Sequence, residues 1–336
     1  MPVMAALVLL ARACGPVVTR RHRERAGELA EALYPGRLRV IGARPLFPQA
    51  GGSEIAFAVT GDPDAVVRLR VDAGAGSCGG QPCDRALARA LREARTAAED
   101  LRALSAALGR CGYEVYAVGS ARSAVGEPWI AAALTDDTVT DVLGEIGACL
   151  RRWSLDRPAP EGSPVPRGTT VNVVAPEAVR DLPAGPSRWP TLMRLTHPRL
   201  PAALSRRPYH AVHYAWRDGA VDPASATVRI VRPFAQRQRF DAAVRANVAS
   251  WLGSAVPGAV VVEGYGGVWR LVPGRVDRLS GHVLFCAPED PHARGRRCPG
   301  CHAVAVTVGP DGALAGEPVV VRGVREGDGS LRLPPP

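Results

Sequence analysis

The residues with the most recognisable chemical spacing lie near the C-terminus, where Cys298, Cys301 and His302 spell C-x-x-C-H. This is the spacing of a c-type haem attachment site, in which two thioethers hold the porphyrin and the histidine binds its iron. The same cysteines, with Cys286 and either His292 or His302, would also supply ligands of the types that zinc prefers. A thioredoxin-like redox motif is disfavoured, because no helix is predicted after Cys301.

The predicted elements around this motif favour neither a haem nor a zinc site. Strand-like runs at 283–286 and 303–308 flank it, whereas small c-type cytochromes carry the motif at a helix end within a helical domain. Structural zinc sites often pair two C-x-x-C units, and this chain has one. We therefore expect no cofactor and no catalytic residue here, and keep haem or zinc at Cys298, Cys301 and His302 as the alternative.

The cysteines are more consistent with disulfide bonds. The chain has eight of them, which is typical of proteins from an oxidising compartment. Sequence alone does not fix their pairing, but distance along the chain suggests three pairs. The candidates are Cys78 with Cys83 across a flexible loop, Cys286 with Cys298 across a hairpin, and Cys111 with Cys149 between two elements. Cys301 is then the cysteine left over.

The N-terminal stretch MPVMAALVLLARACG is similar to a bacterial lipoprotein signal. An apolar run, Val3 to Leu10, is followed by small residues and Cys14, which would be lipidated and become the first residue of the mature chain. The stretch departs from the usual pattern, because it has no positive start, and Ala11 and Arg12 stand where leucine and a small or apolar residue are usual. The other interpretation is a cytoplasmic protein with a hydrophobic N-terminus.

The net charge of +10 does not indicate a nucleic-acid partner. All 42 basic residues are arginine, a bias typical of a GC-rich genome, so part of the basicity reports codon usage. A nucleic-acid-binding protein clusters its charge and interleaves aromatic residues, whereas here the arginines are scattered and aromatics make up 5% of the chain. We therefore expect no nucleic acid among the partners.

Hydrophobic periodicity predicts an α+β fold in which helices pack on antiparallel sheets. Apolar residues at helical spacing predict four helices, and alternating runs predict strands between them. The helices are expected at 17–33, 84–108, 139–153 and from 234 to about 256. The strands are expected at 38–46, 54–60, 65–72, 113–118, 129–134, 169–174, 209–216, 226–232, 259–263, 268–272, 282–286, 303–308 and 318–321.

Proline and glycine content divides the chain into predicted parts. These are a lipoprotein signal segment at 1–14, an α+β domain at 15–155, a Pro-rich linker with an extended segment at 156–208, a second α+β domain at 209–326 and a loose tail at 327–336. The stretches LYPGRLRVIGA and AVPGAVVVEGY both join a helix end to a strand through Pro-Gly. They suggest two related units, each a helix followed by a meander of strands.

The layout resembles the uncharacterised secreted lipoproteins of high-GC actinobacteria such as streptomycetes. The stretches that carry the resemblance are LLARACG with the arginine-rich helix after it, CDRALARALREARTAAEDLRALSAAL with CGYEVYAV, and GHVLFCAP. It implies an extracytoplasmic protein anchored through Cys14 to the outer face of the cytoplasmic membrane. We expect such a protein to bind a cell-wall component or another protein rather than to catalyse a reaction.

Overall fold

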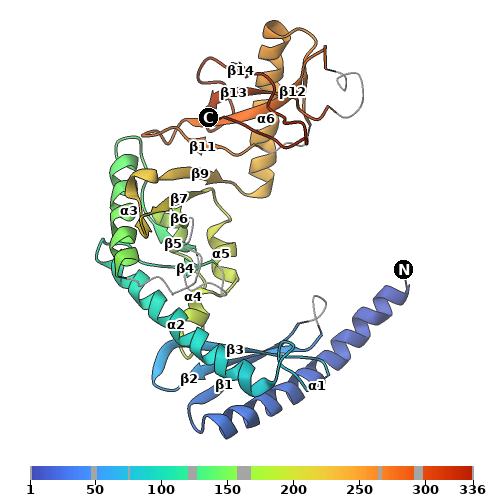
Figure 1. Cartoon of the computed structure of the whole chain (residues 1–336), viewed down its shortest axis with the longest axis vertical. Coiled ribbons are helices and arrows are strands. Elements are labelled where there is room, and N and C mark those ends of the chain that lie inside the picture. The colour runs from blue at the N-terminus through green and yellow to red at the C-terminus, as the bar shows by residue number, and fades with distance from the viewer. Residues whose placement is uncertain are drawn as a thin grey trace. The chain divides into compact units, whose positions relative to one another are not determined.

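The computed structural model describes residues 2–46, 51–74, 76–119, 127–156, 168–263, 267–290 and 298–334, with side chains from residue 18 onward (Figure 1). It has the predicted α+β composition. The chain forms two compact units that differ from the predicted domains. Unit 1 comprises 1–106, 117–126 and 183–201, and unit 2 comprises 107–116, 127–182 and 202–336. Each unit therefore draws on segments that are far apart in the sequence.

Unit 1 is built on a three-stranded antiparallel sheet that follows the first helix. The elements are α1 (Pro2–Leu33), β1 (Leu38–Pro45), β2 (Ser53–Val59) and β3 (Asp62–Val71), with the strands in the order β1-β2-β3. The predicted alternation in the third strand is confirmed, since Val67, Leu69 and Val71 are buried while Arg70 is exposed. One face of this sheet therefore carries the core of the unit.

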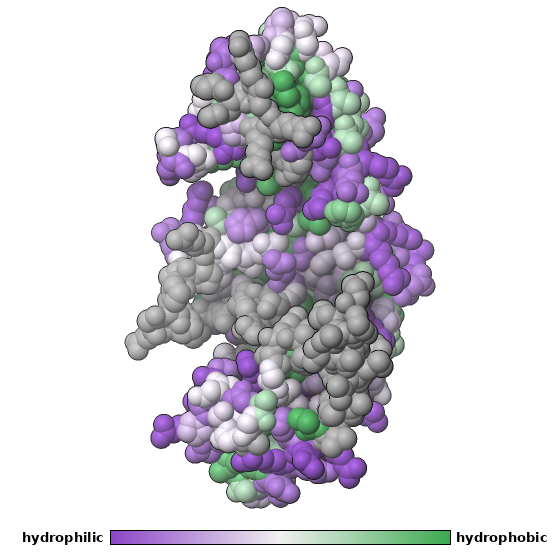
Figure 2. All heavy atoms as spheres, turned by 90° about the vertical axis from the view of Figure 1, so that its right-hand side faces the viewer, coloured by the Kyte–Doolittle hydropathy of each residue, from purple (hydrophilic) through white to green (hydrophobic). Residues whose placement is uncertain are grey.

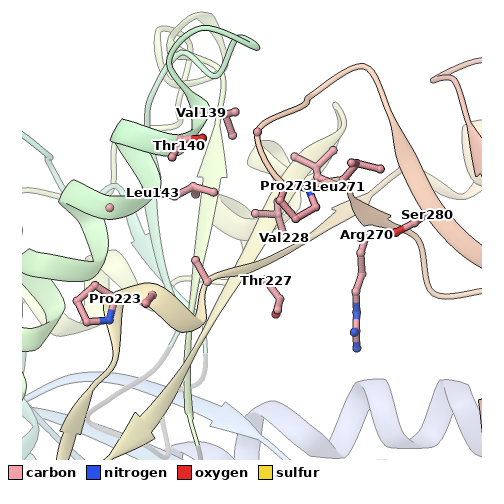
Figure 3. A pocket seen from close by; sticks show the side chains of 15 residues that line it. Val139, Thr140, Leu143, Pro223, Thr227, Val228, Arg270, Leu271, Pro273 and Ser280 are labelled. Atoms are coloured by element: carbon pink, nitrogen blue, oxygen red, sulfur yellow. The ribbon is translucent and has the colours of Figure 1, made fainter. Parts of the chain in front are cut away.

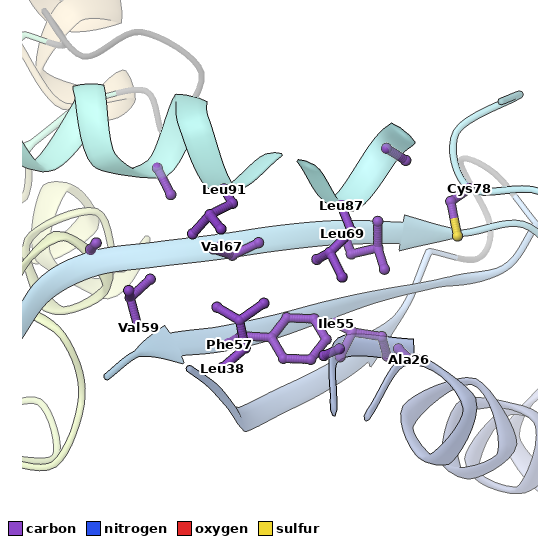
Figure 4. Packing of buried hydrophobic residues seen from close by; sticks show 14 of the residues in the cluster. Ala26, Leu38, Ile55, Phe57, Val59, Val67, Leu69, Cys78, Leu87 and Leu91 are labelled. Carbon is purple, nitrogen blue, oxygen red and sulfur yellow. The ribbon is translucent and has the colours of Figure 1, made fainter. Parts of the chain in front are cut away.

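Two helices contribute to that core. Ala26 and Ala30 of α1 belong to the same buried cluster as Leu87 and Leu91 of α2 (Cys83–Gly109), with Phe57 among the strand residues between them (Figure 4). The predicted apolar seam of α2 is buried along its length: Leu87, Leu91, Ala94, Ala98, Leu101 and Leu108. The helix begins at Cys83 rather than after Asp84, which lies in its first turn instead of capping it.

The predicted linker and extended segment at 156–208 contains more helix than expected. Residues 157–167 lie outside the described residues, and the strand predicted at 169–174 is present as β6 (Gly168–Val174), which pairs within the sheet of unit 2. Two short helices occur where an extended path was predicted, α4 (Thr191–Leu195) and α5 (Arg199–Leu204). Pro190 and Pro198 directly precede them, a position in which proline starts a helix rather than breaking one. Within unit 1, α4 lies against β3.

Unit 2 contains one large mixed sheet. Besides β6, its strands are β5 (Pro128–Ala131), β7 (Tyr209–Arg217), β9 (Thr227–Val231), β11 (Arg270–Leu271), β12 (Leu279–Cys286), β13 (His302–Val308) and β14 (Val319–Val321). They lie in the order β14-β13-β12-β11-β9-β7-β6-β5, and β8 (Ala220–Val221) pairs with β7. A two-residue strand, β4 (Ala117–Val118), belongs to unit 1.

One strand pair departs from the predicted antiparallel arrangement. β5 and β6 run parallel, and α3 (Val139–Leu155) connects them. Two parallel neighbouring strands need a long crossover connection, usually a helix. The predicted order of strand, helix and strand is therefore compatible with a parallel pair. The other pairs in the sheet of unit 2 are antiparallel, as predicted.

The last long helix, α6 (Phe234–Ala255), precedes the C-terminal strands in the chain. Its buried residues are Phe240, Val244, Val248 and Leu252. A four-residue and three-residue spacing from Phe240 through Val244 and Val248 would place Trp251 on this face, but Trp251 is only partly buried and Leu252 occupies the core position. Next come β10 (Val260–Val261), which pairs with β12, and then the meander β12-β13-β14. This meander continues the large sheet, whereas the meander of unit 1 is a separate sheet, so the two predicted repeats are built differently.

The described residues include no helix that is both long and apolar enough to cross a membrane. On the face drawn in Figure 2, hydrophilic side chains predominate among the described residues, and hydrophobic ones occur in small groups.

Candidate functional site

The C-x-x-C-H motif leads directly into β13. Gly300 has a φ of +78°, and a Cβ added to it would lie 2.8 Å from Cβ of Leu284. His302 begins β13 opposite Phe285 of β12, so the motif lies between two strands, as predicted.

The predicted disulfide across this hairpin is present. Cys286, the fully buried last residue of β12, is bonded to Cys298, with their Cα atoms 5.9 Å apart. Cys301 is the free cysteine among the described side chains, again as predicted. The bond and the free thiol thus occupy the same end of the β12–β13 hairpin.

Asp290 completes the cluster, and sequence reasoning missed it. A sulfur of Cys286, a sulfur of Cys301 and a carboxylate oxygen of Asp290 lie within 4.8 Å of one another. The backbone N–H of Ala287 donates to Asp290 Oδ2 at 2.7 Å, which fixes the carboxylate in place. The only signal in the sequence was an acidic pair, Glu289 and Asp290, four residues or fewer after a cysteine.

His302 faces the same carboxylate. Its Nδ1 accepts a hydrogen bond from the backbone N–H of Gly323 at 3.0 Å, so the proton of the neutral ring is on Nε2. Nε2 then donates to Oδ1 of Asp290 across 3.3 Å. Both side chains are largely buried, 12% exposed for His302 and 13% for Asp290. His302 therefore holds Asp290 rather than pointing into open space.

The surroundings also act on the free thiol. Burial raises the pKa of Cys301, and the negative charge of Asp290 raises it further, while Arg325 acts in the opposite direction. The guanidinium of Arg325 donates to the carbonyl oxygens of Pro299 and Gly300, so it also holds the backbone between Cys298 and Cys301. A thiol with a raised pKa is a weak nucleophile near neutral pH.

The haem alternative fits this arrangement poorly. Thioether attachment through Cys298 would require the bond to Cys286 to be broken, and both ring nitrogens of His302 already have partners. The other histidine considered for zinc, His292, lies outside the described residues. The donor set that the structure does bring together comprises the sulfurs of Cys286 and Cys301 and the carboxylate of Asp290, with the sulfur of Cys298 bonded to that of Cys286.

The remaining predicted disulfides are also formed. Cys78 is bonded to Cys83 in unit 1, and Cys111 to Cys149 in unit 2, with Cα separations of 4.8 Å and 6.5 Å. Neither has a third cysteine beside it among the described side chains. Cys14 lies within α1, in the part whose side chains are not described.

A second candidate site in unit 2 is a cavity of about 580 Å³ beside the N-terminal half of α3. Figure 3 shows the side chains of Val139, Leu143, Val228, Leu271 and Pro273 converging on it from α3, β9 and β11. The full lining is Val139, Thr140, Leu143, Gly144, Pro223, Ala224, Ala226, Thr227, Val228, Arg270, Leu271, Val272, Pro273, Gly274 and Ser280.

The wall of this cavity is held by polar contacts outside it. The turn after β11 is tied to the start of α3, where Asp136 accepts from the backbone N–H of Val276 at 2.6 Å and pairs with Arg275 at 3.2 Å. Asp136 thus fixes the turn after β11 against the start of α3. A cavity of this volume is within the range of small-molecule sites.

Comparison with protein-family models, with curated proteins and with solved structures gives no match for this chain. Its function is therefore argued from the cavity and the cysteine cluster themselves.

Proposed function

We propose that this chain is an extracytoplasmic binding protein, anchored through Cys14 to the outer face of the cytoplasmic membrane, that takes a small apolar ligand into the cavity beside α3. The observation that carries the binding role is the cavity. Its lining is mostly aliphatic, with hydroxyls of Thr140, Thr227 and Ser280 and one guanidinium, Arg270, around it. This mixture of an apolar wall and a few polar groups is typical of ligand sites.

The lining favours binding over catalysis. The described residues that form it include no carboxylate, histidine or cysteine. A hydroxyl nucleophile needs a neighbouring base to activate it, and this wall supplies none. The proposed role therefore needs affinity and no reacting group.

Arg270 suggests the chemical class of the ligand. It is exposed at the edge of the cavity, and its side chain extends away from the aliphatic wall in Figure 3. No ion pair of Arg270 occurs among the described residues. A ligand with an apolar body and an anionic group would place the body against Leu143 and Val228 and the charge near this guanidinium.

The extracytoplasmic location is supported by the cysteines. Six are joined in three disulfides, and such bonds persist in oxidising compartments. Intact mass of the protein from an exporting GC-rich host tests the anchor. We expect a chain that begins at a diacylglycerol-modified Cys14, and loss from the membrane fraction on Cys14→Ser. A chain that begins at Met1 with free thiols would refute this part of the proposal.

Gly144 offers a clean test of the cavity. It lines the cavity, and a Cβ at this position would meet no atom within 4 Å, so Gly144→Leu adds a side chain at the cavity wall with no clash at its Cβ. Replacing a glycine inside a helix by leucine also favours the helix by roughly 0.5–1 kcal/mol. Urea unfolding of the variant checks that a loss of binding does not come from a loss of stability.

The probe is 8-anilinonaphthalene-1-sulfonate, which joins aromatic rings to an anionic sulfonate. We expect Gly144→Leu to weaken its binding at least tenfold, and Arg270→Gln to weaken it less and remove part of its salt dependence. Gly253→Leu is the matched control, since Gly253 is an exposed glycine of α6 whose Cβ would also meet nothing within 4 Å. Equal binding by wild type and Gly144→Leu would refute the cavity as the site.

A further inference from the structure

We propose that Cys286, Cys298, Cys301 and Asp290 form a redox-dependent zinc site, which binds Zn²⁺ when the Cys286–Cys298 bond is reduced. The proposal is independent of both the cavity and the Cys14 anchor. It rests on the grouping of Cys286, Cys301 and Asp290, with Cys298 bonded to Cys286, at the end of the hairpin where the loop joins β12 to β13.

The distances suit a tetrahedral metal. Sulfurs of Cys286 and Cys301 and an oxygen of Asp290 already lie within 4.8 Å of one another, and the sulfur of Cys298 is bonded to that of Cys286. Zinc–sulfur bonds of about 2.3 Å place tetrahedral ligands roughly 3.8 Å apart. Reduction of the disulfide lets its two sulfurs separate to that distance, while the Cys286–Cys301–Asp290 group needs only a small contraction.

The backbone presents the ligands in a fixed way. Cys286 ends β12 and pairs with Val260 of β10, while Cys298 and Cys301 flank Gly300, whose φ of +78° favours glycine. Arg325 holds the backbone between these two cysteines, since it donates to the carbonyl oxygens of Pro299 and Gly300. These restraints do not depend on the disulfide itself, so the sulfurs are kept near one another after it is reduced.

Asp290 has the supporting contacts of a metal ligand. Metal-bound carboxylates are commonly hydrogen-bonded by a second group that orients them. Here the N–H of Ala287 contacts Oδ2 at 2.7 Å and Nε2 of His302 faces Oδ1 at 3.3 Å. Each oxygen keeps a lone pair for a metal. His302 is thus a positioning residue, and the ligand is the carboxylate.

The chemistry balances with a dithiol as the reductant. The dithiol attacks the Cys286–Cys298 bond, becomes an intramolecular disulfide, and leaves a proton on each freed sulfur. Zn²⁺ then displaces the protons of the three thiols to solvent as it binds. Three thiolates and one carboxylate give the bound site a net charge of −2, partly balanced by the guanidinium of Arg325 close to the turn.

The test is metal binding by the full chain under anaerobic conditions. After reduction by a dithiol and its removal, we expect one Co²⁺ per chain, with the visible absorption of a tetrahedral thiolate site and displacement by Zn²⁺. The oxidised chain should not bind. Failure of the reduced chain to bind, or equal binding by the oxidised chain, would overturn the proposal.

Variants assign the ligands. Cys301→Ser leaves all three disulfides intact in the oxidised chain, so its fold is verified there by circular dichroism before reduction. We expect it to lower the affinity of the reduced chain at least a hundredfold, and Asp290→Asn at least tenfold. The double variant Cys78→Ser/Cys83→Ser is the control, because it removes two other reducible sulfurs and should bind as the wild type does. Unchanged affinity in Cys301→Ser or Asp290→Asn would overturn the assigned ligand set.

Discussion

The Cys78–Cys83 loop of unit 1 and the Cys286–Cys298 loop of unit 2 are built from similar parts but differ in what their side chains are free to do. Each has a disulfide, a glycine of positive φ and a carboxylate. In the first, Asp72 accepts from the N–H of Gly80 and the hydroxyl of Ser77, both at 2.8 Å, and pairs with Arg70 at 3.3 Å.

The second loop adds reactive groups to the same framework. Its carboxylate, Asp290, has a thiol and an imidazole beside it, and the sulfur of Cys301 is not part of a bond. A disulfide with a carboxylate next to it is therefore a structural feature in unit 1 and a candidate ligand set in unit 2. The third cysteine makes the difference.

The largest effect is expected from the two turn glycines. Gly80→Ala and Gly300→Ala both place an alanine at a φ near +77°, which costs about 1–2 kcal/mol. A Cβ at Gly80 meets nothing within 4 Å, whereas one at Gly300 lies 2.8 Å from Leu284 Cβ. Overpacking of this kind adds about 1–3 kcal/mol. We expect urea unfolding to show a loss of about 3 kcal/mol for Gly300→Ala and about 1 for Gly80→Ala. Equal losses would show that the turn in unit 2 is not tightly packed.

A smaller difference is expected when each disulfide is removed. The bonds close loops with sequence separations of 5 and 12 residues, and the loop-entropy relation assigns them stabilities of about 2 and 3 kcal/mol. Cys78→Ser/Cys83→Ser and Cys286→Ser/Cys298→Ser should therefore differ by about 1 kcal/mol in free energy of unfolding under oxidising conditions, with the C-terminal pair costing more. A larger loss of free energy of unfolding for the Cys78–Cys83 pair than for the Cys286–Cys298 pair would contradict this prediction.

The sequence predicted the parts of both loops that depend on neighbours along the chain. Cys78 and Cys83 are five residues apart around a glycine loop, and Cys286 and Cys298 flank a hairpin, so proximity followed from turn chemistry. Most helices and strands were predicted for the same reason, since the period of buried residues is local. The seam of α2 from Leu87 to Leu108 is an example.

What the sequence could not predict depends on long-range packing. His302 reaches Asp290 because β12 and β13 pair in one register and because Gly323, after β14, turns its imidazole. The cavity draws its wall from α3, β9 and β11, which are distant in the sequence. Trp251 and Leu252 are adjacent on α6, and a shift of one residue in the helix face decided which is buried. No local pattern contains this information.

The smallest expected effect is a loss of folding stability in acid, which comes from the charge of Asp72 beside the Cys78–Cys83 loop. The hydrogen bonds from Gly80 and Ser77, together with the charge of Arg70, lower the pKa of Asp72. An acid with a lowered pKa stabilises the folded chain above its unfolded pKa of about 3.9, and this contribution is lost as the pH falls through the folded value.

Asp72→Asn should therefore reduce the free energy of unfolding by about 1 kcal/mol at pH 7, since the side chain is 22% exposed and solvent screens part of the interaction. The difference between variant and wild type should shrink as the pH falls through the folded pKa of Asp72. Urea unfolding at several pH values measures it, with Asp84→Asn in the first turn of α2 as the control carboxylate. A difference that does not shrink in acid would mean that Asp72 acts through the shape of the loop rather than through its charge.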